Sequence, residues 1–191
     1  MLKLNIGGFK HQDKFKGIGW TTVDNRPNTT GIKVDLNIDT IPQGANTVDA
    51  IYTSHTLEHI LPHRQSTIFK NMYYILKPNS LIRIVVPDID IAVKRYLNKE
   101  PLNLEGMSSK QPCLPDINVC WLSGWFFTYR EKGEFLGGHV MGYNKELLTH
   151  YLINAGFKNI VILSHNVMSP IFENCDLDMH ENYSIYMEAQ K

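Results

Sequence analysis

The sequence predicts a single α/β domain with a mostly parallel sheet, and three observations support this prediction. Short apolar runs rich in β-branched residues alternate with turn residues in the first half of the chain. A helical repeat lies between two of these runs, and a strand, helix and strand of this length form a right-handed parallel crossover. The chain has 191 residues, 43% hydrophobic and 20% charged, which fits one globular domain over residues 1–191.

The expected strands are apolar runs that end in polar or turn residues. They cover residues 2–6, 18–23, 32–34, 48–53, 81–86, 159–163 and 183–188. Continuous runs of this kind are typical of strands buried on both faces of a parallel sheet.

Helices are expected where apolar residues recur at a spacing of three and four. Ile68, Phe69 and Met72 belong to the clearest of them, which ends at Lys77-Pro78 because proline cannot continue a helix. The others cover residues 56–61, 89–97 and 145–154, and Gly156 ends the last.

Two parts of the chain depart from a regular alternation of strands and helices. About ten residues separate the first two strands and show no helical period, and a short polar turn links the second strand to the third. We therefore expect the helices on one sheet face to be reduced or missing. Residues 98–140 read as an aromatic-rich insertion, with Trp121, Trp125 and Tyr129 on one side of a helix.

Composition excludes several classes of function. Lys+Arg and Asp+Glu both number 19, so a nucleic-acid partner is unlikely on charge grounds and a small ligand fits better. Cys113, Cys120 and Cys175 form no C-x-x-C pair, which argues against a disulfide framework or a structural zinc site. No apolar run approaches the ~20 residues of a membrane span, and the N-terminus is too polar for a signal peptide. We expect a cytoplasmic protein.

Residues suited to ligand binding follow four expected strands. Parallel sheets bind ligands at the carboxyl ends of their strands. The candidates there are Ile6, Gly7 and Gly8, then Asp24, then Asp35 and Leu36, and finally Ser54 and His55. Each of these is a common turn residue when taken alone, and their order along the chain is what indicates a site.

That order resembles the small class I S-adenosylmethionine-dependent methyltransferases. The matching segments are Leu4-Asn5-Ile6-Gly7-Gly8, Thr22-Val23-Asp24, Val34-Asp35-Leu36, Ser54-His55-Thr56-Leu57-Glu58-His59, Leu76-Lys77-Pro78 and Ile84-Val85-Val86-Pro87-Asp88. The resemblance covers nearly the whole chain except the insertion. It implies a Rossmann-like seven-stranded sheet of order 3-2-1-4-5-7-6 with the last strand antiparallel.

The resemblance also implies a cofactor and roles for these residues. S-adenosylmethionine would be the methyl donor, with Ile6, Gly7 and Gly8 beneath its methionine part and Asp24 on its ribose. Asp35 and Leu36 would border the adenine, and Ser54 and His55 would flank the sulfonium. No metal is expected.

The expected reaction is methyl transfer to an oxygen or nitrogen of a small acceptor. Such an acceptor can need a base near neutral pH, and the candidates are His55, His139 and Asp88, with Tyr143 behind them. Each of these residues also has a purely structural interpretation as a hydrogen-bonded group.

Two alternatives stay open. The reduced glycine loop is compatible with a non-catalytic nucleoside-binding or assembly module. His55, Glu58 and His59 also match the H-x-x-E-H pattern of a zinc peptidase, with Glu100, Glu105 or Glu131 as a further ligand. Against the peptidase, the motif starts at a strand end and Pro62 follows closely.

The reduced helices raise the question of what covers the second sheet face. A parallel sheet open on one side exposes a large apolar patch. We expect the aromatic insertion or a second subunit, in a homodimer, to cover it.

Overall fold

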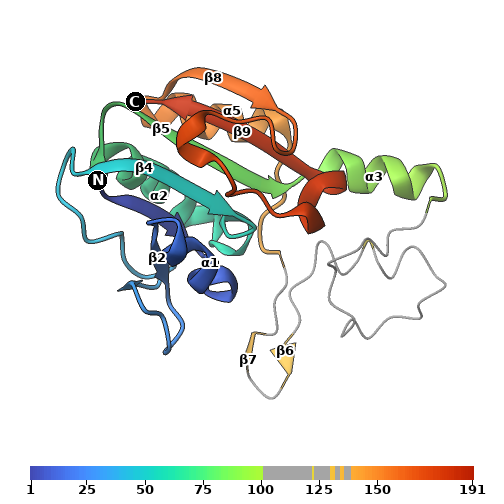
Figure 1. Ribbon diagram of the computed structural model, residues 1–191. Helices are drawn as coiled ribbons and strands as arrows, with labels where there is room; N and C mark the ends of the chain where they lie inside the picture. Colours follow the sequence, from blue (N-terminus) through green and yellow to red (C-terminus); the bar gives the residue numbers. More distant parts are fainter. Residues whose placement is uncertain (101–121, 123–129, 132–133, 136–138) are drawn as a thin grey trace.

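The computed structural model describes residues 1–100, 122, 130–131, 134–135 and 139–191, and the description below concerns these residues (Figure 1). The main-sheet strands are β1 (Lys3–Ile6), β2 (Thr21–Asp24), β3 (Ile32–Lys33), β4 (Val48–Ser54), β5 (Leu76–Pro87), β8 (Lys158–Leu163) and β9 (Ser184–Gln190). The helices are α1 (Gln12–Gly17), α2 (Gln65–Ile75), α3 (Ile89–Leu97) and α5 (Lys145–Ala155). A short antiparallel pair, β6 (Arg130–Glu131) and β7 (Glu134–Phe135), stands apart from the sheet.

The strand order is β3-β2-β1-β4-β5-β9-β8. Strands β1 to β5 pair in parallel, and β9 is antiparallel to both β5 and β8. The expected order with an antiparallel last strand is thus confirmed. No described helix has the length and apolar character needed to span a membrane.

Helices α2 and α5 cover one face of the sheet. Ile68, Phe69 and Met72 of α2 are fully buried there, as are Leu148 and Leu152 of α5. The helix α5 ends where expected, because Gly156 takes the left-handed conformation (φ +107°) that a helix C-terminus favours. The predicted helix over 56–61 is instead a 3₁₀ turn, η2 (Leu57–His59), followed by a second turn, η3 (Pro62–Arg64).

The opposite face carries an aromatic cluster. Phe15, Trp20, Tyr52, Phe172 and Tyr186 are buried in it, and Phe15 stacks on Tyr52 with ring centroids 5.4 Å apart. Phe15 lies on α1, which is a reduced helix between the first two strands, within the expectation that the helices on this face are reduced or missing. The helix has six residues and buries only Phe15, which is too few for a repeat to show in the sequence.

Residues 164–183, which connect β8 to β9, lie across this face (Figure 1). They contain two 3₁₀ turns, η4 (Pro170–Phe172) and η5 (Asp178–Tyr183). Cys175 in this connection is a free, buried thiol, while Cys113 and Cys120 lie outside the described residues. Residues of this connection therefore cover the face over Tyr52, Val85 and Tyr186, whereas most of the insertion expected to cover it lies outside the described residues.

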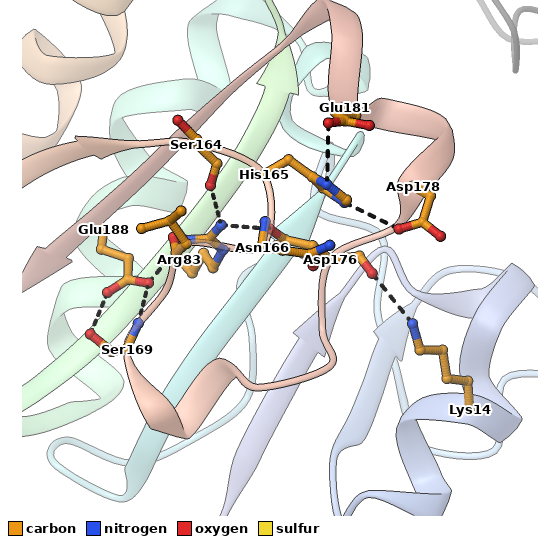
Figure 2. A network of polar contacts seen from close by, with 11 residues as sticks. Lys14, Arg83, Ser164, His165, Asn166, Ser169, Asp176, Asp178, Glu181 and Glu188 are labelled. Carbon is orange, nitrogen blue, oxygen red and sulfur yellow. Dashed lines mark hydrogen bonds and ion pairs between the residues drawn. The ribbon is translucent and has the colours of Figure 1, made fainter.

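A buried ion network fixes this connection to the sheet (Figure 2). Arg83 of β5 is fully buried and donates two hydrogen bonds to the Asp176 carboxylate, at 2.9 and 2.6 Å. It donates a third to Glu188 of β9 at 2.9 Å. Glu188 also accepts from the backbone N–H and hydroxyl of Ser169, so both carboxylates hold the connection in place.

Candidate functional site

The loop after β1 packs so closely against neighbouring residues that it has little room for side chains at Gly7 and Gly8. Gly7 has φ +75°, and its N–H donates to the Val23 carbonyl at 2.7 Å. A Cβ at Gly7 would collide with the side chain of Thr56, and one at Gly8 would collide with Asn5. Glycine is therefore required at Gly7, whose backbone is left-handed, whereas a side chain at Gly8 would displace that of Asn5. The loop after β1 lies directly against the loop after β4.

Asp24 joins the loops after β1 and β2. Its carboxylate accepts hydrogen bonds from the backbone N–H groups of Phe9 at 3.3 Å and Arg26 at 3.0 Å. A carboxylate has about four acceptor positions, so these two bonds leave others for a ligand. Asp24 is half-buried at the carboxyl edge of the sheet.

Asp35 and Leu36 follow β3 at the same edge. The Asp35 carboxylate accepts from the backbone N–H of Asn37 at 2.9 Å, which stabilises the turn. Leu36 is 8% exposed and packs in the same core cluster as Ile6. The side chain of Ile6 is fully buried there, so only its backbone is available to a ligand.

His55 follows β4 in an unusual conformation. It has φ +49°, a region that costs a non-glycine residue about 1–3 kcal/mol and that surrounding contacts must hold. Its Nε2 lies 2.9 Å from the Ser184 hydroxyl, and its ring stacks on His180 with centroids 3.6 Å apart. Burial lowers the pKa of His55 well below its usual value, and the neighbouring histidines lower it further.

Glu58 is the centre of a cluster of titratable side chains. Its Oε1 lies 3.5 Å from His55 Nδ1, 3.8 Å from His59 Nε2 and 4.0 Å from His139 Nε2. Burial raises the pKa of Glu58 to about 8. Burial, followed by the charge of His59, lowers the pKa of His139 to about 4.

The peptidase arrangement of His55, Glu58 and His59 is not formed. Two histidine ligands at i and i+4 need one helix face, whereas His55 lies at a strand end and His59 ends a 3₁₀ turn. Glu100 accepts a hydrogen bond from Asn98 beyond the end of α3. Glu105 and the side chain of Glu131 lie outside the described residues, as do the aromatic residues of the insertion named above.

Asp88 and Tyr143 both have structural roles. The Asp88 carboxylate accepts from the backbone N–H of Asp90 at 3.0 Å and so caps the first turn of α3. Burial raises the pKa of Asp88. The Tyr143 hydroxyl donates to Gln65 inside the core.

Most of the residues expected at the site do lie at one edge of the sheet. Hydrogen bonds link the loop after β1 to Asp24, and Thr56 beside His55 donates to the Ile6 carbonyl at 3.1 Å. His180 and Ser184 also contact His55, and neither was predicted from the sequence. An antiparallel last strand must begin at the carboxyl end of β5, so the predicted topology itself could have revealed them.

Comparison with known proteins supports the fold over nearly the whole chain and a family match over part of it. Residues 20–84 match a family described as methyltransferase domain. No curated protein matches the chain in sequence.

Three solved structures illustrate the similarity. A SAM dependent methyltransferase from Archaeoglobus fulgidus has a TM-score of 0.59 at 16% identity, over 99% of this chain and 85% of that one. A SAM-dependent methyltransferase from Methanosarcina mazei has a TM-score of 0.59 at 17% identity, over 99% of this chain and 91% of that one. The third is the 1,6-didemethyltoxoflavin-N1-methyltransferase of Burkholderia thailandensis, with bound 1,6-didemethyltoxoflavin and S-adenosylhomocysteine. Its TM-score is 0.55 at 14% identity, and the match covers 100% of this chain and 70% of that one. At these identities the likeness shows a shared fold.

Proposed function

We propose that this chain is a class I S-adenosylmethionine-dependent methyltransferase and that it methylates an oxygen or nitrogen of a small acceptor. Its fold and the match of residues 20–84 to a methyltransferase domain support this proposal. The observation that carries this proposal is the convergence of the loops after β1, β2 and β4. Asp24 bonds to the first loop through Phe9 N–H, and Gly7 packs on Thr56 of the third.

The residues at this edge suit a nucleoside sulfonium ligand. Asp24 would accept from the ribose hydroxyls, and each charge-assisted bond contributes about 1.5–3 kcal/mol. The backbone of Ile6, Gly7 and Gly8 would pass beneath the methionine part. Asp35 and Leu36 would border the adenine. S-adenosylmethionine supplies the methyl group, and because it carries no phosphate the protein needs no phosphate-binding loop.

Methyl transfer is an in-line displacement, and positioning of the two reactants provides much of the rate. Ser54 and His55 would flank the sulfonium. Both ring nitrogens of His55 face protein groups, Ser184 and Glu58. We therefore propose His55 as a positioning residue, whereas His139 lies beside Glu58 and Asp88 caps α3.

A small acceptor is supported by the balanced charge of the chain, which offers no general attraction to nucleic acid. The Burkholderia protein of similar fold is described with 1,6-didemethyltoxoflavin bound. A screen of small-molecule fractions for uptake of labelled methyl groups would identify the acceptor.

Calorimetric titration with S-adenosylmethionine and S-adenosylhomocysteine tests the cofactor assignment. We expect binding at micromolar concentrations, weakened about 100-fold or more in Asp24→Ala because two charge-assisted bonds of at least about 1.5 kcal/mol each are lost. Asp39→Asn, which removes an exposed carboxylate nearby in the chain, is the control and should bind normally.

The same experiment separates the alternatives. Absence of binding to either ligand at millimolar concentrations contradicts the proposal. Binding without transfer to any acceptor would support a nucleoside-binding module instead.

A further inference from the structure

We propose that Glu58, His59 and His139 form a binding site for a divalent transition-metal ion, and that Zn²⁺ is the ion their donors suit best. One carboxylate oxygen and two imidazole nitrogens lie within 4.8 Å of one another in this cluster. This departs from the expectation of no metal, and it uses a different set of residues from the peptidase pattern, because His55 is not a ligand.

The burial of Glu58 is the first argument for an ion. Its side chain is 2% exposed, and in the described part of the chain neither carboxylate oxygen has a hydrogen-bond partner. A buried carboxyl group without hydrogen bonds is costly, and buried charges are normally paired or bound to metals. A divalent cation beside the two histidines would satisfy this group.

The distances fit after small movements. Zinc binds imidazole nitrogen and carboxylate oxygen at about 2.0–2.2 Å, which places donors of a tetrahedral site about 3.3–3.6 Å apart. The Glu58 oxygen lies 3.8 Å from His59 Nε2 and 4.0 Å from His139 Nε2. Contraction by about half an ångström would bring the Glu58 oxygen to coordination spacing from each histidine, and the two imidazole nitrogens already lie within 4.8 Å of each other.

The backbone already holds the two halves of the cluster together. The Glu58 carbonyl accepts hydrogen bonds from the N–H groups of Val140 at 2.9 Å and Met141 at 3.1 Å. These bonds place His139 beside the turn that carries Glu58 and His59. Ligands on a backbone fixed in this way lose little freedom when an ion binds.

The cluster also has a route from solvent. Exposure of the side chains rises from 2% at Glu58 to 25% at His139 and 44% at His59. Three protein ligands with an open fourth position are typical of catalytic zinc sites, in which water or substrate completes the coordination. Glu58 also contacts His55, so the ion would lie next to the proposed cofactor site.

This position indicates a class of acceptor, an inference that rests on the proposed function. A small molecule with an oxygen or nitrogen donor could occupy the fourth position and be oriented toward the sulfonium. Metal binding itself does not depend on that step and can be measured without any acceptor.

The test uses the full chain after treatment with a chelator. Titration with Zn²⁺ should show one equivalent bound, and Co²⁺ should give the visible spectrum of a four-coordinate nitrogen and oxygen site. Glu58→Gln, His59→Ala and His139→Ala should each weaken Zn²⁺ binding about 10-fold or more. His63→Ala, which removes an exposed histidine of η3, is the control and should leave binding unchanged.

Two readouts keep the outcomes apart. S-adenosylhomocysteine affinity and thermal unfolding are measured on every variant, so a misfolded protein is recognised, and the exposed His59 offers the substitution least able to disturb folding. No stoichiometric Zn²⁺ binding, or equal binding by the three variants and wild type, overturns the metal site while leaving the cofactor assignment intact. If the wild-type protein binds Zn²⁺ but not S-adenosylhomocysteine, the proposed function is overturned and the metal site is not.

Discussion

The imidazole rings of His55 and His180 lie nearly parallel, with centroids 3.6 Å apart and planes at 16°. This stack joins the end of β4 to the turn that precedes β9, and His180 also bonds to the Tyr183 hydroxyl at 2.8 Å. Burial lowers the pKa of His180 to about 4. Among the charged neighbours, Asp176 acts in the opposite direction, whereas His11, His165 and Lys10 lower it further.

The low pKa of His180 predicts that folding stability falls in mild acid. Because the folded pKa lies below the unfolded value of 6.5, the unfolded chain binds more protons between about pH 6.5 and 4. Stability should therefore decrease as the pH falls through that window, and less so in His180→Gln. Urea unfolding at several pH values, with chelator present, measures this. The exposed His150→Gln should retain the wild-type slope, and an unchanged slope in His180→Gln would contradict the prediction.

Arg83→Met should strongly destabilise the protein. It leaves the buried carboxylates of Asp176 and Glu188 without their cation, and breaking a buried pair in this way costs about 3–5 kcal/mol. Lys77→Met breaks the exposed pair with Asp49 and should cost at most about 1 kcal/mol. Chemical denaturation gives both values, and hydrogen exchange should show the loss first in residues 164–183. Equal costs for the two variants would show that the buried network does not anchor the connection.

Gly7→Ala should destabilise the chain by at least about 1–2 kcal/mol, because a side chain is strained at φ +75° and its Cβ would collide with Thr56. Gly17→Ala is the matched control, since nothing lies within 4 Å of the added Cβ. It should be neutral or stabilising by up to about 1 kcal/mol. Thermal unfolding distinguishes the two, and a tolerated Gly7→Ala would refute the close packing of this loop.

Asp88→Asn should keep both stability and methyl transfer, because asparagine caps a helix about as well as aspartate. Asp88→Ala should lose about 1 kcal/mol of stability through the missing bond to Asp90 N–H. Transfer rates and unfolding curves are needed for both variants. A folded Asp88→Asn protein without activity would instead make Asp88 a catalytic residue.

The helices with clear end signals could be predicted from the sequence. Helix α3 occupies the expected residues, Ile89–Leu97, because Asp88 caps its start, and Gly156 marks the end of α5. Helix α1 could not be found because a six-residue helix with one buried side chain has no measurable period. The strand β5 begins earlier than expected, at Leu76, and passes the turn residues with Asn79 at φ +65°.

The candidate site was predictable only where it consists of strand ends. The loops carrying Gly7, Asp24 and His55 meet as expected because parallel strands end at one edge. Contacts between segments far apart in the chain could not be predicted, because neither segment has a sequence pattern that indicates its partner. Arg83 lies in an apolar run, and nothing in the sequence indicates that Asp176 and Glu188 neutralise it.

The antiparallel course of β9 has a consequence for the order in which the protein matures. Ser184 reaches His55 only once β9 has inserted between β5 and β8, and β9 is the last of the described elements to leave the ribosome. A nascent chain that stops short of it lacks both the central pairing of β5 and one wall of the site. Ligand-binding competence should therefore arise only after β9 has been made, when most of the remaining sheet can already have formed.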